Sequence, residues 1–563
     1  MRKLEEPLKI MPIIGVTVCF LLFTILSFWV YLERTLEGDI NNHILAGEMF
    51  GTPSELVQKG IKPLYHGEGQ TGWDGQFYYY MANDLLGLKD TAVHIDAPAY
   101  RYQRIGMSLF AAIIAKLINS DWVSPILYIY SYLTLITIAS IVGARLLQSM
   151  GVNPYWILLW SLSAGTQITL FNALPDAAAD SFLIIAIGFI VIRRYFFASV
   201  FFSFAALSRE VYAIFPAAIL FVSVVMPAIA NLSRENFKAR LLSLFFPSPI
   251  YFLLIPCIVV VGWQAYVISH FGVAPSKLAH GILGAPFSAW YEYFMSSVRG
   301  HHKLVGAGWV SIAELLSLAS FLFILVLSAI ASVRVVLCRE EPFHGGRGLA
   351  LAWVMLIGLY ACFGPTVMMH YTGYFKAISI FLFLIPLYLG FCGFSSVIRR
   401  ILFFIIIVIF CQVGIYNMKA RILPVHSNLD KYTKMSSVST SGSYECFNDY
   451  RYSVEINDIE YFRSRFLSGL PDYMLMNINV VNLSSYPWIS HSLGLGSVHM
   501  SYQWLDVDNN VVVDGIRSAI LNKVNPQDSI NTTLFVAVPH VSDVHLELSP
   551  VQEGCAWFHN YSK

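Results

Sequence analysis

Long hydrophobic runs separated by short polar segments fill the first 417 residues of this 563-residue chain. A helix that crosses a hydrocarbon core about 30 Å thick needs roughly 17 to 25 apolar residues, and many of the runs reach that length. We therefore expect a polytopic α-helical membrane protein. The runs predict eleven transmembrane helices, at about residues 11–32, 123–144, 155–173, 178–192, 195–208, 211–230, 243–264, 309–333, 348–365, 375–396 and 401–417.

Two runs need a separate interpretation. The run Met11–Leu32 is too long for a signal-peptide core and has no small-residue cleavage site, so it predicts a retained transmembrane helix. The run that begins at Ile105 is apolar for only about 14 residues, which is too short for an upright span. We expect a re-entrant or interfacial helix there, because a full span would invert every later loop.

The basic residues give the orientation, since Lys and Arg in short loops collect on the cytoplasmic side of a membrane. A cytoplasmic N-terminus places the external loop 33–104 and everything after about residue 418 on the outer side. It also places every basic cluster between neighbouring spans inside: Arg145, Arg193, Arg194, Arg234, Lys238, Arg240, Arg334, Arg339, Arg347, Arg399 and Arg400.

After about residue 418 the pattern changes to short apolar blocks that alternate with polar residues. Examples are VHMSYQW, VVVD, TTLFVAV and VHLEL, with a turn signal at DVDNN. A period of two bounded by turn residues is typical of antiparallel strands. The chain is thus expected to divide into a helical membrane body, residues 1–417, and an external all-β sandwich, residues 418–563.

Composition and charge exclude other classes of protein. Hydrophobic residues make up 56% and charged residues 13% of the chain, against about 25% charged residues in a soluble domain, so a soluble protein is excluded. The net charge of +1 gives no sign of a nucleic-acid partner. The sequence also lacks a glycine-rich phosphate cradle, which argues against direct use of a nucleotide. A donor substrate must therefore arrive in the membrane.

The first external loop carries the sharpest candidate chemistry. Asp39 follows the first predicted helix by about seven residues, and Asp74 lies in GWDGQFYYY. A carboxylate at the membrane interface can act as a general base toward a sugar hydroxyl, while neighbouring aromatic rings stack on the sugar and exclude water. Alternatively, these aromatic residues populate the interfacial belt of a membrane protein, which composition alone favours. The candidate sugar or lipid contacts are Trp73, Gln76, Tyr78, Tyr79, Tyr100 and Glu210.

Cations in the outer segments are candidate phosphate ligands, because a guanidinium fork matches phosphate oxygens. Arg101 and Arg104 share a helix face if the segment after Pro98 is helical. Lipid headgroups or loop acids are equally good partners for this pair, and Arg209 could instead form a structural ion pair. Lys376 is a further candidate in a later outer segment. The outer histidines do not have zinc-ligand spacing, so no metal site is predicted.

Two blocks of the external loop match a family pattern. GWDGQFYYYMANDLL followed by APAYRYQRIGMSLFAAI resembles the first external loop of bacterial GT-C type glycosyltransferases, in which a W/Y-D-G-Q-F-Y-Y block precedes a D-x-P-A-Y-R-Y-Q-R block and a short apolar helix. It is more distantly similar to the W-D segment of the glycosylphosphatidylinositol mannosyltransferase II family. ALSRE and NALPDAAAD resemble two later junctions of the GT-C family, and the whole resemblance covers about residues 11–417.

This resemblance implies inverting transfer of a single sugar from a polyprenyl-phosphate donor to a surface glycan or glycolipid, outside the bacterial cytoplasmic membrane. Asp74 is then the leading catalytic base or acceptor-orienting acid, with Asp39 second, although the family does not fix which acid is the base. Cations would neutralise the departing lipid phosphate. Mg²⁺ or Mn²⁺ stays open as a cofactor. The implied phosphate ligands are Arg101, Arg104, Arg209 and Lys376.

The C-terminal region has a resemblance of its own. SYQWLDVDNNVVVDGIRSAIL, VNPQDS, VAVPH and LELSPVQEGCAWF are similar to the β-sandwich glycan-binding domain of O-antigen ABC transporters, over about residues 475–560. Trp504 and Trp557 are candidates for stacking on sugars, although a tryptophan on an alternating strand is more often a core residue. The chain departs from the usual Pro-Gly turns at 526–527 and 541–543. Cys446 and Cys555 form a hypothetical disulfide if the compartment is oxidising.

Other functions remain as alternatives. A flippase or exporter subunit would handle the same lipid-linked sugars, but the sequence shows no inverted pattern of interrupted helices. An oligosaccharide polymerase or ligase would transfer a preassembled block instead of one sugar. A membrane protein that only binds glycans is the remaining possibility.

Overall fold

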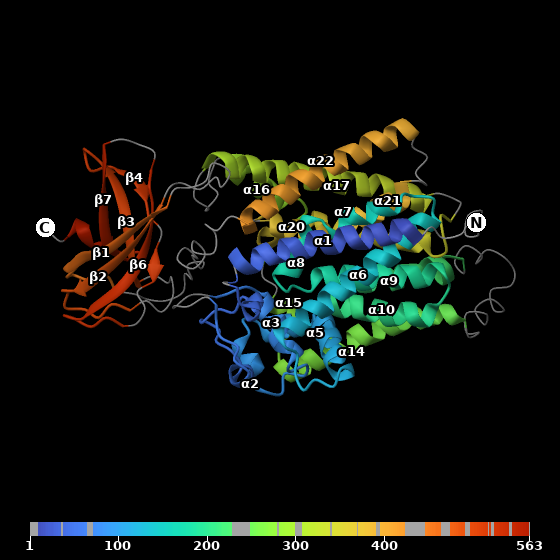
Figure 1. Cartoon of the computed structure of the whole chain (residues 1–563), viewed down its shortest axis with the longest axis horizontal. Helices are drawn as coiled ribbons and strands as arrows, with labels where there is room; N and C mark the ends of the chain where they lie inside the picture. The colour runs from blue at the N-terminus through green and yellow to red at the C-terminus, as the bar shows by residue number, and fades with distance from the viewer. Residues whose placement is uncertain are drawn as a thin grey trace. The chain divides into compact units, whose positions relative to one another are not determined.

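The computed structural model describes residues 10–34, 36, 38–64, 71–227, 248–278, 281–298, 307–337, 341–368, 370–389, 395–422, 445–462, 473–489, 496–515, 517–519, 523–539 and 543–561. The chain forms two compact units. The helical unit holds the described residues of Met1–Val30, Asp74–His301 and Ser311–Met418, and the second unit holds those of Tyr31–Trp73, His302–Val310 and Lys419–Lys563. Figure 1 shows the helices of the first unit and the strands of the second.

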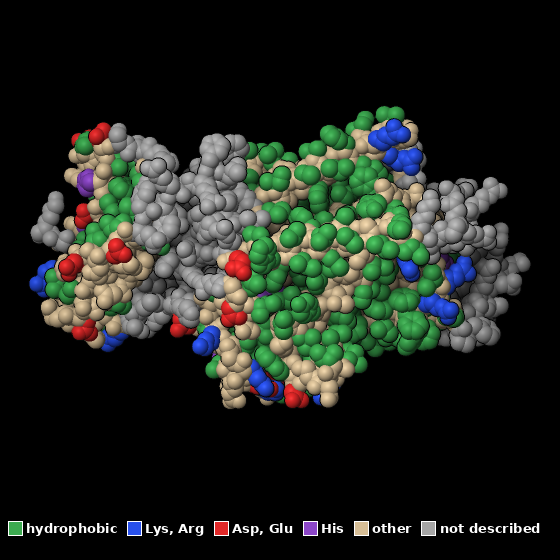
Figure 2. All heavy atoms as spheres, viewed as in Figure 1, with side chains coloured by type: hydrophobic (Ala, Val, Ile, Leu, Met, Phe, Trp, Pro, Cys, Tyr) green, Lys and Arg blue, Asp and Glu red, His purple; other side chains and the backbone are tan. Residues whose placement is uncertain are grey.

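The helical unit contains helices that are long and apolar enough to cross a membrane. Among the described residues there are five: Ile10–Glu33, Pro125–Ser149, Pro249–Phe271, Ile312–Leu337 and Ser396–Met418. Two bent pairs raise the number to seven if each pair is one span. They are Ala164–Phe171 with Asp176–Val191, bent by 120°, and Tyr371–Ile378 with Phe381–Leu389, bent by 43°. The visible face of this unit is mostly hydrophobic, with its charged side chains toward the two ends (Figure 2).

The predicted count of eleven spans is therefore not confirmed. The predicted spans 195–208, 211–230 and 348–365 fall on apolar helices of 10–17 residues, which are shorter than the roughly 20 residues of an upright span. The predicted span 155–173 is divided among three short helices. A hydropathy pattern reports how apolar a run is, but it does not report where the chain turns within the run.

The helices of the described residues follow one another closely along the chain. They are α1 (Ile10–Arg34), η1 (Ile40–Ile44), α2 (Ser54–Gln58), α3 (Gly75–Ala82), η2 (Asp90–His94), α4 (Pro98–Tyr102), α5 (Gly106–Leu117), α6 (Pro125–Ser149), η3 (Pro154–Ile157), α7 (Leu158–Ser161), α8 (Ala164–Phe171), α9 (Asp176–Val191), α10 (Tyr195–Ser208), η4 (Glu210–Ala213), α11 (Ile214–Leu220), η5 (Phe221–Val225), η6 (Pro249–Leu254), α14 (Ile255–Phe271), α15 (Pro275–Leu278), α16 (Ser288–Val298), α17 (Ala307–Leu337), α18 (Gly346–Ala361), α19 (Pro365–Met368), α20 (Tyr371–Ile378), α21 (Phe381–Leu389), α22 (Ser396–Ile422) and η7 (Phe558–Asn560).

Helix α9 is the central element of the helical unit, packed between α6 and α10. Every residue from Ala177 to Ile187 is buried, and the polar members Asp180 and Ser181 are buried with the rest. A helix that is apolar on all sides belongs in the interior of a bundle. The buried Asp180 is therefore the exception that needs polar partners.

The short apolar run predicted from Ile105 forms α5, a helix of 12 residues. Gly106 lets its first turn approach α10 closely, since a Cβ on Gly106 would lie 2.3 Å from Ser208 Oγ and 2.6 Å from Phe204 O. Ser108 Oγ donates to Tyr78 O at 2.6 Å, which ties α5 to α3. Helix α5 thus holds α3 against the bundle.

The C-terminal part of the second unit consists of two antiparallel sheets. One has the order β1-β2-β6, and the other has the order β4-β3-β7-β8 with β5 paired to β3. The bounds are β1 (Tyr452–Phe462), β2 (Tyr473–Asn482), β3 (Val498–Asp506), β4 (Val511–Asp514), β5 (Ser518–Ala519), β6 (Ser529–Ala537), β7 (Val544–Gln552) and β8 (Ala556–Trp557). The apolar blocks that predicted strands correspond to β3, β4, β6 and β7.

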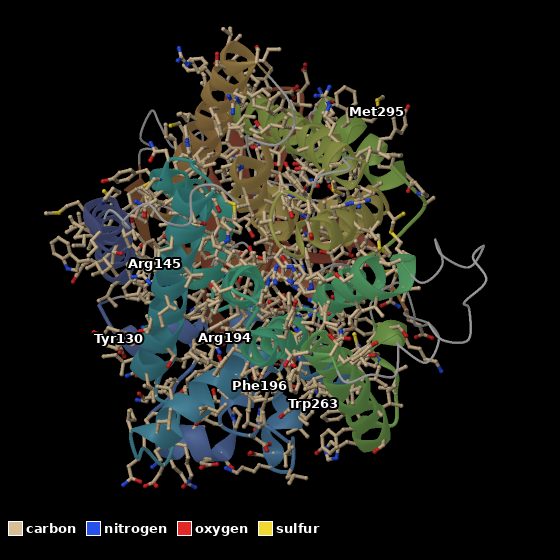
Figure 3. All side chains as sticks on the ribbon, turned by 90° about the vertical axis from the view of Figure 1, so that its right-hand side faces the viewer. Tyr130, Arg145, Arg194, Phe196, Trp263 and Met295 are labelled. Atoms are coloured by element: carbon tan, nitrogen blue, oxygen red, sulfur yellow. A yellow bond between two sulfur atoms is a disulfide. The ribbon has the colours of Figure 1, made fainter. Side chains whose placement is uncertain are left out.

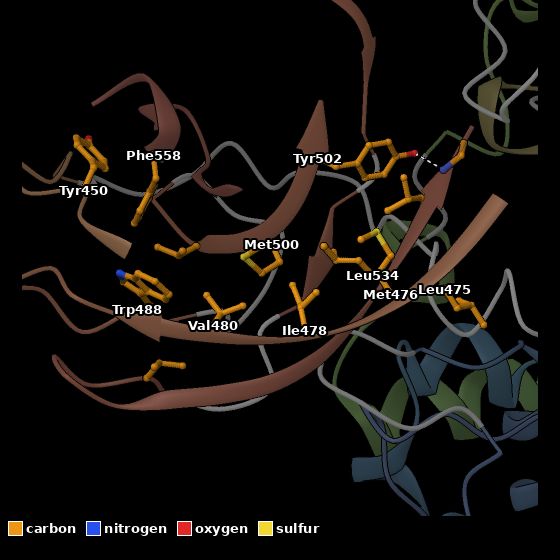
Figure 4. Packing of buried hydrophobic residues seen from close by; sticks show 14 residues of the cluster. Tyr450, Leu475, Met476, Ile478, Val480, Trp488, Met500, Tyr502, Leu534 and Phe558 are labelled. Carbon is orange, nitrogen blue, oxygen red and sulfur yellow. Dashed lines mark hydrogen bonds between the residues drawn. The ribbon is translucent and has the colours of Figure 1, made fainter. Parts of the chain in front are cut away.

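The two sheets enclose one hydrophobic core, as Figure 4 shows. Each fully buried side chain of this kind stabilises the fold by about 1.5–3 kcal/mol. Tyr502 on β3 links the two sheets, because its hydroxyl accepts a hydrogen bond from Ala537 N on β6 at 2.9 Å. The labelled members of the core are Tyr450, Leu475, Met476, Ile478, Val480, Trp488, Met500, Tyr502, Leu534 and Phe558.

A disulfide between Cys446 and Cys555 joins the segment before β1 to the turn between β7 and β8, with 5.5 Å between the Cα atoms. The two turns that lack the usual Pro-Gly sequence still contain a left-handed residue, namely Gln527 at φ 69° and Asp543 at φ 63°. Glycine adopts this conformation without a steric penalty, whereas a side chain with a Cβ does not. Gln527 and Asp543 therefore adopt their backbone conformation at a local conformational cost.

Candidate functional site

Asp74 lies directly before α3, at the point where this helix meets the bend between α8 and α9. A Cβ on Gly75 would lie 1.9 Å from Asn172 O, so only glycine permits the approach. Ala173 in the same bend is left-handed, with φ 53°. The contact brings the segment that begins at Asp74 against NALPDAAAD, whose Asp176 begins α9. The two segments lie about a hundred positions apart in the sequence.

Arg101 on α4 holds Asp74 and Asp96 together. It donates to Asp96 from Nε at 2.9 Å and from Nη2 at 2.7 Å, and Nη2 lies 3.0 Å from Asp74 Oδ1. The Arg101 side chain is 10% exposed, whereas that of Asp74 is 50% exposed. Burial alone lowers the pKa of Arg101, but Asp74 and Asp96 raise it well above its ordinary value. The guanidinium therefore stays charged beneath a half-exposed carboxylate.

Arg104 pairs with Glu210 of the ALSRE junction. Its Nε and Nη2 donate to the two carboxylate oxygens at 2.9 and 2.8 Å. Burial raises the pKa of Glu210, but the charge and hydrogen bonds of Arg104 outweigh this and lower it to about 2. The ring of Tyr100 lies between the arginines, with its centre 5.5 Å from the Arg101 guanidinium and 4.9 Å from that of Arg104. The pair keeps both charges at neutral pH.

Arg209 differs from these two arginines because its hydrogen bonds go to neutral oxygens. Nη1 donates to Ala377 O at 3.0 Å and to the Tyr212 hydroxyl at 3.3 Å. The nearest carboxylate oxygen, Asp176 Oδ1, lies 4.0 Å from Nε. The guanidinium also faces the rings of Tyr212 and Tyr360 at 5.2 and 5.6 Å. Arg209 is thus a buried cation whose hydrogen bonds go to neutral oxygens and whose ion pair with Asp176 is long.

A buried polar cluster around Asp180 adjoins Arg209, because the Tyr212 hydroxyl accepts from Arg209 and donates to Asp180. Asp180 accepts hydrogen bonds from Trp160 Nε1 at 3.1 Å and from the hydroxyls of Tyr212 and Ser379. The sequence indicated NALPDAAAD, the segment that ends at Asp180, but did not indicate these partners. The available signal was weak: Tyr212 follows Arg209 by three positions, and Ser379 follows Lys376 by three.

The tyrosines of GWDGQFYYY are mostly interior residues. Tyr78 and Tyr79 are each 1% exposed, and Gln76 is fully buried. Burial raises the pKa of Tyr78 to about 12, so its hydroxyl stays protonated. Tyr79 packs edge-on against Tyr128 with 5.8 Å between ring centres. The structure therefore places these three predicted contact residues in the packing beneath the site, whereas Tyr100 lies among the arginines.

Three further predicted site residues belong to other elements: two lie in the second unit and one lies on α20. Asp39 belongs to the second unit, where its Oδ1 accepts from Asn41 N at 2.9 Å and caps η1. Trp73 also belongs to the second unit, and its backbone N–H donates to Leu45 O at 3.0 Å. Lys376 is half-buried on α20 beside Ala377, whose carbonyl holds Arg209. No acid pairs with Lys376 among the residues that the structure describes.

The two candidate tryptophans of the sandwich have different surroundings. Trp504 packs against the core, and its Nε1 donates to Ala537 O at 2.7 Å. Trp557 is half-buried, and the Arg517 guanidinium lies 4.7 Å from its ring centre. Arg517 is in turn held by Glu553 at 2.8 Å. Trp504 is thus a structural residue, and Trp557 is part of a polar edge.

A second buried carboxylate, Glu314 on α17, was not predicted from the sequence. It is fully buried and accepts from the hydroxyls of Tyr293 and Tyr416, with His370 Nε2 at 3.2 Å. Within the described part of the chain, no group of three or more His, Cys, Asp and Glu residues is arranged to hold a metal ion. The cluster therefore links α16, α17, α22 and the segment before α20 by hydrogen bonds.

Comparisons with protein-family models, with curated proteins and with solved structures found no match to this chain.

Proposed function

We propose that the chain is an inverting glycosyltransferase of GT-C type, which moves a single sugar from a polyprenyl-phosphate donor to a surface glycan or glycolipid. The reaction would take place at the outer face of the bacterial cytoplasmic membrane, with the N-terminus cytoplasmic and the β sandwich periplasmic. The five to seven candidate spans support a membrane location. An eleven-pass topology further requires α8 and α9 to cross separately and α10, α11 and α18 to cross as well.

The observation that carries the proposal is a half-exposed carboxylate beside buried arginines. Asp74 is 50% exposed, whereas the side chains of Arg101, Arg104 and Arg209 are only 10%, 20% and 10% exposed. Charges are costly to bury in a helical bundle, so they are retained mainly where they serve a function. An accessible base next to preorganised cations is the arrangement that transfer from a phosphate-linked donor requires.

In the proposed reaction, the acceptor hydroxyl attacks the anomeric carbon from the side opposite the phosphate. Asp74 accepts the hydroxyl proton as the new glycosidic bond forms. The bond between the anomeric carbon and the phosphate oxygen breaks, and its electron pair leaves with the polyprenyl phosphate. The configuration at the anomeric carbon is therefore inverted. Asp39 remains the second candidate base.

The arginines would stabilise the charge that develops on the leaving phosphate. Arg209 is the best placed, because its hydrogen bonds go to neutral oxygens and its only ion pair among the described residues, with Asp176, is long at 4.0 Å. Arg101 and Arg104 already bind carboxylates, so their contribution requires a partial exchange of partners. Lys376, which follows on α20, is the fourth cation of the proposed donor site. Mg²⁺ or Mn²⁺ stays open as a further counterion.

The β sandwich would hold or measure the acceptor glycan. Trp557 supports this role better than Trp504, since Trp504 is engaged in the core. A flippase and an oligosaccharide polymerase or ligase remain the alternative functions. A flippase would move the lipid-linked sugar without forming a glycosidic bond, and a polymerase or ligase would add the mass of a whole oligosaccharide block.

The test is transfer by the purified full chain in lipid nanodiscs, with candidate polyprenyl-phosphate sugars as donors and mass analysis of the glycan product. We expect the addition of one sugar by the wild type and a loss of about 10³-fold or more in kcat for Asp74→Asn. Asp121→Asn is the matched control, because Asp121 is an exposed acid outside the site. Wild-type turnover in Asp74→Asn would remove the assigned base, and a product of block mass would favour the polymerase or ligase.

A further inference from the structure

Helix α14 carries three aromatic residues that form a ladder along one face. Trp263, Tyr266 and His270 are spaced by three and four positions, which puts them on the same side of a helix. The rings of Trp263 and Tyr266 stack at 5.2 Å and 25°, and those of Tyr266 and His270 stack at 5.5 Å and 8°. The ladder adjoins α4, and Trp263 is labelled in Figure 3.

Each rung donates a hydrogen bond to a backbone carbonyl of the external loop. Trp263 Nε1 donates to Tyr102 O at 2.8 Å, the Tyr266 hydroxyl donates to Leu86 O at 2.8 Å, and His270 Nε2 donates to Gly87 O at 3.0 Å. A carbonyl oxygen can only accept, so His270 must carry its proton on Nε2 in this arrangement. The three hydrogen bonds hold the loop at two places, Leu86–Gly87 and Tyr102.

Of the three carbonyl acceptors, that of Tyr102 matters most for the site because it lies next to the candidate phosphate ligands in the sequence. Tyr102 is the last residue of α4, which is only five residues long and leaves its final carbonyls without helical partners. It also stands between Arg101 and Arg104 in the sequence. The Tyr102 ring is fully buried against Phe271 at 5.1 Å, and its hydroxyl donates to Asp84 O at 2.9 Å. The backbone between the two arginines is therefore fixed to α14 from both sides.

The Leu86–Gly87 end of the loop is fixed in the same way. Gly87 is left-handed at φ 65°, and a Cβ there would lie 3.1 Å from Phe271 and 3.3 Å from Tyr102. Asp84 closes the adjoining turn by accepting from Leu88 N and Lys89 N, both at 3.0 Å. An ordinary interfacial belt presents its N–H and O–H groups to lipid headgroups and water. In this ladder all three groups instead donate hydrogen bonds to backbone carbonyls of the loop.

We propose that the α14 ladder, and Trp263 above all, is a positioning device that sets Arg101 and Arg104 at the distance required for a lipid phosphate. The effect on the phosphate rests on the function proposed above, whereas the hold on the loop does not. Trp263 does not touch the reacting atoms, so its role is to position the arginines through the Tyr102 carbonyl.

The test compares Trp263→Phe and Tyr266→Phe, which keep a ring and remove the donor, with Tyr130→Phe as the control. Tyr130 is 59% exposed, and its hydroxyl has no hydrogen-bond partner among the described residues. Hydrogen exchange is measured on amides 84–104 of the purified full chain. We expect exchange about three- to tenfold faster in Trp263→Phe, a smaller increase in Tyr266→Phe and none in Tyr130→Phe.

The second readout is the KM for the polyprenyl-phosphate sugar, compared with the KM for the acceptor. We expect the donor KM of Trp263→Phe to rise about fivefold while the acceptor KM is unchanged, because only the arginines have lost their support. Exchange at the wild-type rate in both variants would show that the ladder does not hold the loop. Faster exchange with an unchanged donor KM would overturn its positioning role. If the wild type transfers no sugar, the proposed function fails, and the exchange rates alone decide whether α14 holds the loop.

Discussion

The same arginine–aspartate fork occurs in both units, with a buried arginine in one and an exposed arginine in the other. In the helical unit, Arg101 donates to Asp96 from Nε at 2.9 Å and from Nη2 at 2.7 Å. In the β sandwich, Arg451 donates to Asp449 from Nε and Nη2, both at 2.9 Å. The Arg101 side chain is 10% exposed, whereas that of Arg451 is 68% exposed; their acids, Asp96 and Asp449, are 31% and 18% exposed. Burial of the arginine, rather than bond length, distinguishes the two forks.

Because of this difference, the two ion pairs are expected to contribute differently to the stability of their units. An exposed pair adds little to stability, because water solvates both groups when they part and salt screens them. Removal of one partner from a buried pair leaves an uncompensated charge and is strongly destabilising. The helical unit therefore depends on its ion pairs to keep charge in the candidate site. In the β sandwich the Arg451 fork is not needed in this way, because the hydrophobic core and the disulfide hold the strands.

The largest expected effect tests the disulfide of the sandwich. Replacement of Cys446 and Cys555 by serine opens a link between residues 109 positions apart, which should destabilise the sandwich by about 4 kcal/mol. Hydrogen exchange of β2 and β3 amides should become faster, while exchange in α6 and α9 stays the same. Cys19→Ser is the control, because Cys19 is an exposed free thiol. Unchanged exchange in β2 and β3 would show that the core suffices without the link.

The next effect tests the buried pair of Arg104 and Glu210. Glu210→Gln leaves the Arg104 guanidinium without its carboxylate, and we expect the free energy of unfolding to fall by about 3 kcal/mol. Denaturant unfolding in detergent, followed by hydrogen exchange in α5 and η4, measures the loss. Arg451→Gln removes the exposed partner of the other fork and should leave the exchange of β1 and β2 unchanged at 0.15 M salt, a roughly physiological ionic strength. Equal effects of the two substitutions would contradict the role given to burial.

The pH dependence of stability gives a second test of the Arg104–Glu210 pair. The folded pKa of Glu210 is about 2, below its ordinary 4.5, so the stabilisation is fully present above pH 4.5 and is lost as the pH falls through 2. A pKa change of that size corresponds to about 3 kcal/mol. The stability difference between the wild type and Glu210→Gln should therefore be constant from pH 7 to 5 and should shrink below pH 4.5. A difference that shrinks already between pH 7 and 5 would place the folded pKa above its ordinary value.

The sequence predicted the helical body, several spans and most strands because these depend on local patterns. Predicted spans near 123–144 and 309–333 correspond to α6 and α17, and the alternating blocks correspond to strands. The link between Arg101 and Asp74 was among the alternatives left open, since acids of the same loop were one possible partner of the arginine pair. Such features are encoded within a few dozen neighbouring residues.

The rest of the site depends on contacts between distant segments. Arg104 and Glu210 are 106 positions apart, and Ser379 lies 199 positions from Asp180. Their pairing requires the 120° bend between α8 and α9, which composition does not reveal. The burial of Tyr78 and Tyr79 likewise depends on α5 covering α3. Periodicity within one segment contains no information about which other segment packs on it.

The smallest expected effect concerns the left-handed turn residues of the sandwich, in contrast to Gly75 of the helical unit. Gly75 is needed because a backbone approaches it closely, whereas Gln527 has a side chain in a conformation, φ 69°, that favours glycine. Gln527→Gly removes the steric cost in the folded state but adds freedom to the unfolded chain, so we expect a net gain of about 0.5–1 kcal/mol. Gly75→Ala should have the opposite sign and lower stability by about 1–3 kcal/mol. Denaturant unfolding of each variant measures both. Gln527→Ala keeps the Cβ and should bring no gain; a gain equal to that of Gln527→Gly would show that the Gln527 side chain, and not its backbone conformation, is the source of the strain.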